Sequence, residues 1–110
     1  MRTRAVAKHI RVSPRKARLI VDAIRGMKVE DALAALRFMP SPTAQLVAKV
    51  VHSAASNAEN NFFMSSEGLR VVGASVDGAR TLKRYRARAR GRVSPILKRG
   101  CHITIEVEED

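Results

Sequence analysis

Arginine recurs at every second position in the centre of a strongly basic segment. From Arg80 to Arg99 the chain carries nine Lys or Arg residues and no acidic residue, and residues 84–92 read Arg-Tyr-Arg-Ala-Arg-Ala-Arg-Gly-Arg. Guanidinium groups this close together repel one another unless a polyanion neutralises them, and their planar donors bind phosphates in pairs. The residue types and their spacing therefore predict contact with the phosphates of a nucleic acid.

Charge in the rest of the chain is also distributed in blocks. Residues 1–18 hold seven basic residues and no acid, residues 19–77 hold five basic and six acidic residues, and residues 101–110 hold four acids and no Lys or Arg. The net charge is +11. Positive charge concentrated in two blocks indicates a binding surface rather than general solubility.

Length and composition predict a single domain over residues 1–110. The chain is 45% hydrophobic and has no Trp, so its core must be aliphatic. Its one cysteine cannot form an internal disulfide, which favours a reducing compartment. We find no apolar run of membrane-spanning length and no signal-peptide pattern, and we therefore expect a cytoplasmic protein.

The first elements follow from local patterns. Residues 4–12 alternate as a short strand, with Val6, Ile10 and Val12 expected on one face. Ser13 and Pro14 supply an N-cap and a first-turn proline, and apolar residues then recur at helical spacing until Gly26. This predicts a helix whose opposite face is basic, carrying Arg15, Lys16, Arg18 and Arg25.

Two further helices are predicted before the spacing of the apolar residues changes from a helical period to a period of two. One begins near Val29, with acidic residues favourably placed in its first turn, and ends at Pro40. The next begins at Ser41-Pro42, and its apolar stripe narrows to alanine, which lets another backbone approach closely. The stripe consists of Val47, Val50, Val51, Ala54, Ala55 and Ala58.

A long antiparallel hairpin accounts for the second half of the chain. Alternating residues precede and follow the basic segment: Val72, Ala74 and Val76, then Ile103, Ile105 and Val107. Pairing residues near 69 with residues near 108 places the turn at 88–89 and makes residues 78–100 a protruding arm, with strands of roughly 55 Å. Pro95 cannot donate to a ladder, so we expect a bulge or a wider loop there. The predicted fold is α+β: three helices packed on a small antiparallel sheet, with this arm.

Enzymatic chemistry is not supported by the residues present. His9, His52 and His102 lie far apart in the sequence without metal-ligand spacing, and one cysteine makes no zinc site. Cys101 has no histidine and acid arranged to activate it, and we interpret it as a small strand residue. His9 and His102 lie in basic strands, where either a surface position or an RNA contact fits. We expect no enzyme activity, no cofactor and no metal.

The chain resembles the large-subunit ribosomal protein twenty-two family over essentially its whole length. The resemblance rests on Ser-Pro-Arg-Lys-Ala-Arg at 13–18, Ser-Ala-Ala-Ser-Asn-Ala-Glu-Asn-Asn at 53–61, and above all Ile-Leu-Lys-Arg-Gly-Cys-His-Ile-Thr-Ile at 96–105. The family usually has proline at positions 79 and 87, an apolar residue at 86 and serine at 101, where this chain has Ala79, Ala87, Arg86 and Cys101.

The resemblance implies a structural rRNA-binding protein of the large ribosomal subunit. Its body would bind rRNA near the exit of the peptide tunnel, and its hairpin would line the tunnel and aid subunit assembly. The implied partners are large-subunit rRNA, neighbouring large-subunit proteins including the other tunnel-lining protein, and the nascent chain that passes the tip. We expect neither a membrane contact nor a homo-oligomer.

The charge map and the resemblance together predict the site residues. Those predicted to bind RNA are Arg2, Arg4, Lys8, His9, Arg11, Ser13, Arg15, Lys16, Arg18, Arg25, Asn57, Asn60, Asn61, Arg80, Lys83, Arg84, Arg86, Arg88, Arg90, Arg92, Lys98, Arg99 and His102. Those predicted, from the resemblance, at the tunnel-lining tip are Lys83, Arg84, Arg88, Arg90, Gly91 and Arg92.

Two other classes of protein remain as alternatives. In an architectural or helix-turn-helix DNA-binding protein, the second and third helices would form the motif, although the third helix has only Lys49 as a cation. An assembly protein could instead place the basic arm on an acidic partner. Release of the chain from its native complex by RNase or by DNase would separate RNA from DNA binding.

Overall fold

The strands and helices follow one another in the order that the sequence periods predict. A computed structural model describes residues 2–63, 68–87, 89–91 and 93–109. Its elements, in chain order, are β1 (Arg2–Ile10), α1 (Pro14–Ile24), α2 (Val29–Phe38), α3 (Pro42–Phe62), β2 (Leu69–Gly78), β3 (Leu82–Ala87), a short 3₁₀ turn (Ala89–Gly91), β4 (Val93–Lys98) and β5 (Cys101–Glu109).

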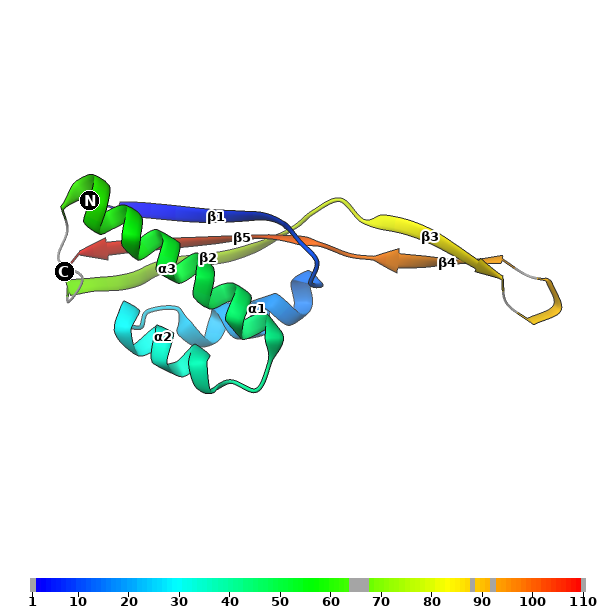
Figure 1. The fold of residues 1–110 in the computed structure, drawn as a ribbon, viewed down its shortest axis with the longest axis horizontal. Coiled ribbons are helices and arrows are strands. Elements are labelled where there is room, and N and C mark those ends of the chain that lie inside the picture. The colour runs from blue at the N-terminus through cyan, green and yellow to red at the C-terminus, as the bar shows by residue number, and fades with distance from the viewer. Residues whose placement is uncertain (1, 64–67, 88, 92, 110) are drawn as a thin grey trace.

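The body is a three-stranded antiparallel sheet with helices on one face. The strand order is β1-β5-β2, so the C-terminal strand β5 lies in the middle. Figure 1 shows the three helices together on one side of this sheet and the β3–β4 ribbon extending away from it. The predicted α+β class, with helices on a small antiparallel sheet and a protruding hairpin, is confirmed.

Both Ser-Pro pairs start helices as predicted. The hydroxyl of Ser13 accepts a hydrogen bond from the N–H of Lys16 at 3.4 Å, and the hydroxyl of Ser41 accepts one from the N–H of Thr43 at 3.3 Å. Each serine occupies the N-cap and each proline the first helical turn. Helix α3 runs on to Phe62, so much of the polar stretch that follows its apolar stripe is helical.

The core lies between α3 and the middle strand. Val47, Val51 and Ala54 on α3 and Ile103 and Ile105 on β5 are all fully buried. Ala58 is fully buried as well and Ala55 is partly buried, which fits the predicted close approach of α3 to its neighbours. This aliphatic core fixes the body that carries the arm.

The predicted inward face of β1 is wrong in its first half. Thr3 and Ala5 face the core, whereas the side chain of Val6 is 44% exposed. A bulge between Ala7 and Ile10 inserts one extra residue, and His9 takes a φ of 57° there. Because side chains alternate along a strand, one extra residue moves the positions after it to the other face of the sheet. Ile10 therefore packs against the core, as predicted.

A second bulge overturns the predicted face of β2. Leu69 and Val71 are buried, and the register shifts between Val71 and Gly73. After the shift Ala74 and Val76 are buried, as predicted, but Val72, predicted on the same face, is not among the buried residues. A uniform period of two cannot describe a strand that contains a bulge.

The arm is a two-stranded ribbon whose tip lies slightly beyond the predicted turn. β3 pairs with β4 in one register, from Leu82 with Lys98 to Ala87 with Val93, which centres the turn on residue 90 rather than 88–89. The expected bulge at Pro95 is wrong, because Pro95 pairs with Tyr85 without a register shift. Each strand of a two-stranded ribbon has one edge without a partner strand. A proline whose nitrogen lies on that edge removes no hydrogen bond between the strands.

The arm makes the molecule elongated. The molecule extends over 62 × 26 × 17 Å, and its radius of gyration is 16.9 Å. A compact chain of this length has a radius of gyration of ~13 Å. The start of β1 and the end of β5 lie at the end of the body opposite the arm (Figure 1). The arm therefore meets the body at the other end of the sheet, where the basic residues of three segments converge.

Candidate nucleic-acid interface

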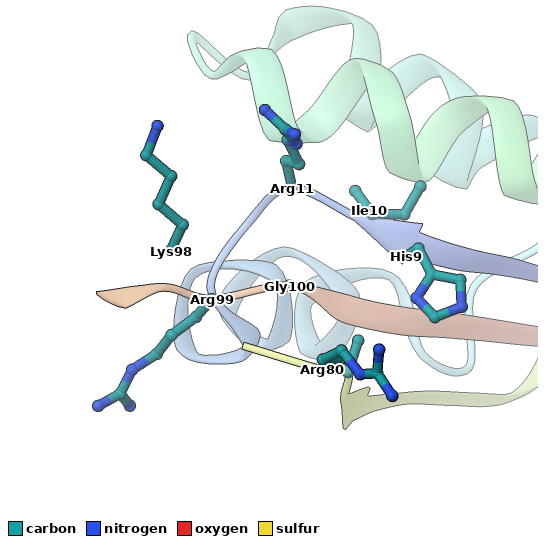
Figure 2. A pocket seen from close by; sticks show the side chains of 8 residues that line it. His9, Ile10, Arg11, Arg80, Lys98, Arg99 and Gly100 are labelled. Carbon is teal, nitrogen blue, oxygen red and sulfur yellow. The ribbon is translucent and has the colours of Figure 1, made fainter. Parts of the chain in front are cut away.

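A hollow of about 880 Å³ lies where the arm joins the body. Three segments that are distant in sequence form it: residues 9–11 at the end of β1, residues 79–80 after β2, and residues 98–100 before β5. We call it the junction hollow. Figure 2 shows its lining residues around the point where these segments cross.

Gly100 allows the three segments to come close together. The N–H of Ala79 donates to the carbonyl of Gly100 at 3.1 Å. A Cβ added at Gly100 would lie 3.1 Å from the carbonyl oxygen of Ile10 and 3.6 Å from the Cβ of Ala79. A side chain at this position would therefore push β1 away from the base of the arm.

Among the residues that the structure describes, those lining the hollow include several cations and no acidic residue. Arg11, Arg80, Lys98 and Arg99 are all exposed, and His9 completes the polar lining. In Figure 2, Arg11 and Lys98 extend to one side of Gly100, Arg99 to the other, and Arg80 lies on the same side as His9. A concave surface lined with one sign of charge concentrates its field and attracts anions.

His9 and His102, which lie far apart in the sequence, are in contact. The main-chain N–H of His9 donates to Nδ1 of His102 at 3.1 Å, and the rings meet edge to face with centroids 4.9 Å apart. An accepting Nδ1 carries no proton, so neutral His102 carries its proton on Nε2. This contact holds the β1 bulge against β5 beside the junction hollow.

Two arginines predicted to bind RNA also hold the body together. Nε and Nη2 of Arg18 donate to the carbonyl of Val76 at 3.2 and 3.1 Å, and Nη2 of Arg25 donates to the carbonyl of Ala74 at 2.6 Å. Nη1 of Arg25 also pairs with Asp22 at 2.9 Å. These guanidinium groups cover carbonyls of the edge strand β2, so their role in RNA binding stays a prediction.

The segment after α1 covers another part of this edge. Gly26 donates its N–H to the carbonyl of Val71, Val71 donates its N–H to the carbonyl of Met27, and both distances are 2.9 Å. Nη1 of Arg70 donates to the carbonyl of Gly26 at 3.0 Å. Edge strands left open can pair with other chains, and here the protein's own groups occupy this edge at Val71, Ala74 and Val76.

Arg2 is partly neutralised within the protein. Its Nε lies 3.2 Å from a carboxylate oxygen of Glu108, and its Nη1 lies 3.9 Å from one of Glu106. The acids of β5 therefore lie beside the start of β1, at the end of the sheet away from the arm. The molecule is polarised along its length, with its C-terminal acids opposite the basic junction and arm.

The remaining predicted site residues lie on the body, at the tip or on β3, or fall outside the described residues. Ser13 and Asn57 are half-buried, whereas exposed residues on the body are Arg4, Lys8, Arg15, Lys16, Asn60 and Asn61. Arg90 and Gly91 are exposed at the tip, with φ of 61° and 71°. The backbones of Lys83, Arg84 and Arg86 lie on β3 but their side chains are not described, and the predictions for Arg88 and Arg92 lie outside the described residues.

Helix α3 is not placed as a recognition helix for DNA. Thr43 and Ala44, in its first turn, are buried at 8% and 0% exposure. A recognition helix presents its N-terminal residues to base edges. The helix-turn-helix alternative is therefore wrong for this pair of helices.

The described residues offer no catalytic constellation. No group of three or more His, Cys, Asp or Glu residues that could hold a metal ion occurs within the described ranges. Cys101 is fully buried, and burial raises the pKa of its thiol, an effect that the charge of Arg18 partly offsets. A buried, protonated thiol is a poor nucleophile. Among the helices described, none is long and apolar enough to cross a membrane.

Sequence reasoning missed two parts of this site. It did not predict the contact between His9 and His102, and it gave Gly100 no structural role. A glycine placed between the basic arm and a buried strand was the available signal for a close backbone crossing. Neither feature could be located without the pairing of β1 with β5.

Comparison with known proteins agrees with this arrangement of a helical body and a basic arm. The family model described as ribosomal protein L22p/L17e matches residues 5–108. A protein of Dehalococcoides mccartyi named large ribosomal subunit protein uL22 is 53% identical over 109 residues, covering 99% of this chain and 100% of that protein. Proteins of the same name from Carboxydothermus hydrogenoformans and Halothermothrix orenii are 55% and 51% identical, each over 99% of this chain and 96% of their own length.

The chain belongs to the ribosomal protein L22p/L17e family. This membership confirms the resemblance found in the sequence. It also confirms the expectations of a structural, non-enzymatic ribosomal protein that works in translation and is located in the cytoplasm.

Proposed function

We propose that this chain is an rRNA-binding structural protein of the large ribosomal subunit. Its body binds rRNA near the exit of the peptide tunnel, and its arm passes inward through rRNA, lines the tunnel with its tip and aids subunit assembly. Its partners are large-subunit rRNA, neighbouring proteins including the other tunnel-lining protein, and the nascent chain at the tip. It needs no cofactor and forms no homo-oligomer.

The relatives support the large-subunit assignment. Proteins named large ribosomal subunit protein uL22 match 99% of this chain at 51–55% identity. The match includes the arm as well as the body, because it leaves out almost none of the chain. A similar role for this chain follows from that extent of similarity.

The observation that carries the proposal is a basic ribbon without a core of its own. β3 and β4 form a separate two-stranded sheet, and Figure 1 shows it extending beyond the helices. A two-stranded hairpin alone is marginally stable in water. RNA supplies what is missing, because phosphates neutralise the cations and RNA groups bond to the open strand edges.

Release from native particles tests the proposal. Large subunits containing a tagged copy of the chain would be treated with RNase or with DNase, and the freed protein measured by sedimentation. We expect RNase to release the chain and DNase to leave it bound. Release by DNase, or absence of the tagged chain from large subunits, would contradict the proposal. Crosslinks from residue 90 of the assembled protein would then test the tunnel position of the tip.

A further inference from the structure

We propose that the outer edge of β1, with the apolar groove beside it, is a docking site for an extended protein segment that adds to the sheet as a further strand. The side chains of this segment alternate between apolar and acidic. The proposal goes beyond the proposed function, which names neighbouring proteins as partners but gives the body no surface that binds one.

The two edges of the three-stranded sheet differ. The protein's own groups occupy the edge of β2 at Val71, Ala74 and Val76. On the outer side of β1, the described residues place no strand and no main-chain hydrogen bond from another segment to residues 2–8. Alternate residues of an edge strand direct their N–H and C=O groups outward, so β1 offers a row of unpaired donors and acceptors.

A groove of about 230 Å³ lies between β1 and α3, which runs obliquely beside that strand (Figure 1). The helix contributes residues at i, i+3, i+4 and i+7, which share one face of it: Leu46, Lys49, Val50 and Ser53. The strand contributes Ala5, Val6, Ala7 and Ile10. Among the described residues, none from β5 or β2 lines the groove, so it lies on the outer side of β1.

The groove has room for apolar side chains and apolar surface to cover. Leu46 is half-buried but is not among the partly buried residues that pack against the core. The side chains of Ala5 and Ala7 are small, so larger side chains of an added strand can pack beside them. Burying Leu46 beneath such side chains removes apolar surface from water, which favours binding.

Cations flank the groove and select acidic side chains. Lys49 lines the groove, and Arg4 and Lys8 are exposed on β1. Within the described ranges, the side chains of these three residues make no hydrogen bond or ion pair. Side chains of an added strand point alternately to the two faces of the sheet. Apolar ones would therefore enter the groove, and acidic ones would lie beside Arg4 and Lys8.

Two other occupants fit this edge less well. A second copy of the chain would bring the cations of two β1 strands together, and the acid-rich strand β5 is already paired on both sides. RNA can bind the cations and the strand edge, but it has no alternating apolar side chains to fill the groove. The combination of open edge, apolar groove and flanking cations therefore favours a protein segment.

A synthetic peptide tests the site on the free, full-length chain. The probe alternates valine and glutamate, and the control peptide has the same residues with all valines before all glutamates. We expect the probe, near saturation, to slow amide hydrogen exchange of the outward N–H groups of residues 2–8 at least about tenfold, because strand addition pairs these groups. The control peptide should leave exchange unchanged. Protection by neither peptide, or by both equally, would overturn the proposal.

A pair of matched substitutions tests the groove. Leu46→Asn alters its lining, and Leu19→Asn, at a position of α1 that is 71% exposed, is the control. Since neither leucine belongs to the core, both variants should fold, and similar unfolding midpoints would check this. We expect Leu46→Asn to weaken binding of the alternating peptide at least about fivefold and Leu19→Asn less than about twofold. Equal affinities in both variants would overturn the groove as a docking site.

Photo-crosslinking in assembled large subunits distinguishes protein from RNA. A diazirine side chain would replace Leu46 in one tagged chain and Leu19 in another, and mass spectrometry would identify the adducts. We expect position 46 to crosslink to a protein segment with alternating apolar and acidic residues, and position 19 not to reach that segment. Adducts of position 46 only with rRNA, or with a segment lacking this pattern, would overturn the proposal. Absence of both tagged chains from large subunits would contradict the proposed function instead, and the peptide measurements would still decide the docking site.

Discussion

The main-chain N–H of His9 donates to Nδ1 of His102, 93 residues away in the chain, at 3.1 Å. The bond closes the β1 bulge against β5 beside the junction hollow. His9 has a φ of 57° there, a conformation that is uncommon for a residue with a side chain. A side-chain acceptor therefore holds the backbone where the body meets the arm.

Removing that acceptor should destabilise the body modestly. We expect His102→Ala to lower the free energy of unfolding by about 0.5–1.5 kcal/mol, the usual net worth of one hydrogen bond. Urea denaturation monitored by circular dichroism measures this. His102→Asn, whose side-chain oxygen can replace Nδ1, should recover most of the loss. His52→Ala, on the exposed side of α3, is the control and should change stability by less than about 0.5 kcal/mol.

Arg18 and Arg25 should behave as stabilising residues of the body. Because their guanidinium groups bond to β2 carbonyls, Arg18→Ala and Arg25→Ala should each cost about 1 kcal/mol of unfolding free energy. Both substitutions should also increase aggregation on mild heating, measured by light scattering, because they uncover the edge of β2. Arg15→Ala, exposed on the same helix, is the control. Unchanged stability and aggregation in both variants would show that these bonds do not protect the edge.

Helix positions were predictable because their signals are local. The bonds from Ser13 and Ser41 to nearby N–H groups, and the spacing of Val47, Val51 and Ala54, depend on residues within a few positions of one another. The core face of α3 followed from the same spacing. These features do not require knowledge of which strands pair.

Strand faces and the junction depended on long-range pairing. The assignments of Val6 and Val72 to the inner faces failed because each strand contains a bulge, and a bulge is defined only against its partner β5. The contact between His9 and His102 depends on the same pairing. Charge identified basic residues but could not show that Arg18 is occupied by a carbonyl while Arg80 is unpaired in the described structure.

The arm should contribute little to the stability of the body. Replacing residues 82–98 with an Asn-Gly turn removes β3, β4 and the tip but keeps the Ala79–Gly100 bond. We expect the melting temperature of the free protein to change by less than about 4 °C, because less than about 1 kcal/mol is lost from the body. Differential scanning calorimetry measures this. A fall of more than 10 °C would mean that the arm packs on the body.

Cys101 should be unreactive in the folded protein. Burial raises the pKa of its thiol, so the folded state keeps the proton at pH values where an unfolded chain begins to lose it. We expect a disulfide reagent at pH 8 to modify the native protein only slowly and the urea-unfolded protein completely. Rapid modification of the native protein would contradict the burial of this thiol.

The same shift predicts a dependence of stability on pH. The contribution of the neutral thiol is complete below the ordinary thiol pKa and is lost as pH rises from there through the higher folded pKa. Between pH 7 and pH 10 the free energy of unfolding should therefore fall less for Cys101→Ala than for the unaltered chain. Equal falls in both proteins would show that the thiol does not contribute.

The salt dependence of rRNA binding tests the central claim most directly. If the arm and the junction hollow bind RNA through phosphates, the logarithm of the affinity should fall linearly against the logarithm of salt concentration. A slope of several units is predicted, as roughly 6–10 phosphate contacts would give. Replacing residues 82–98 with the tight turn should reduce that slope without abolishing it, because the junction cations Arg11, Arg80 and Arg99 remain. A nearly flat slope for the unaltered chain would contradict the account.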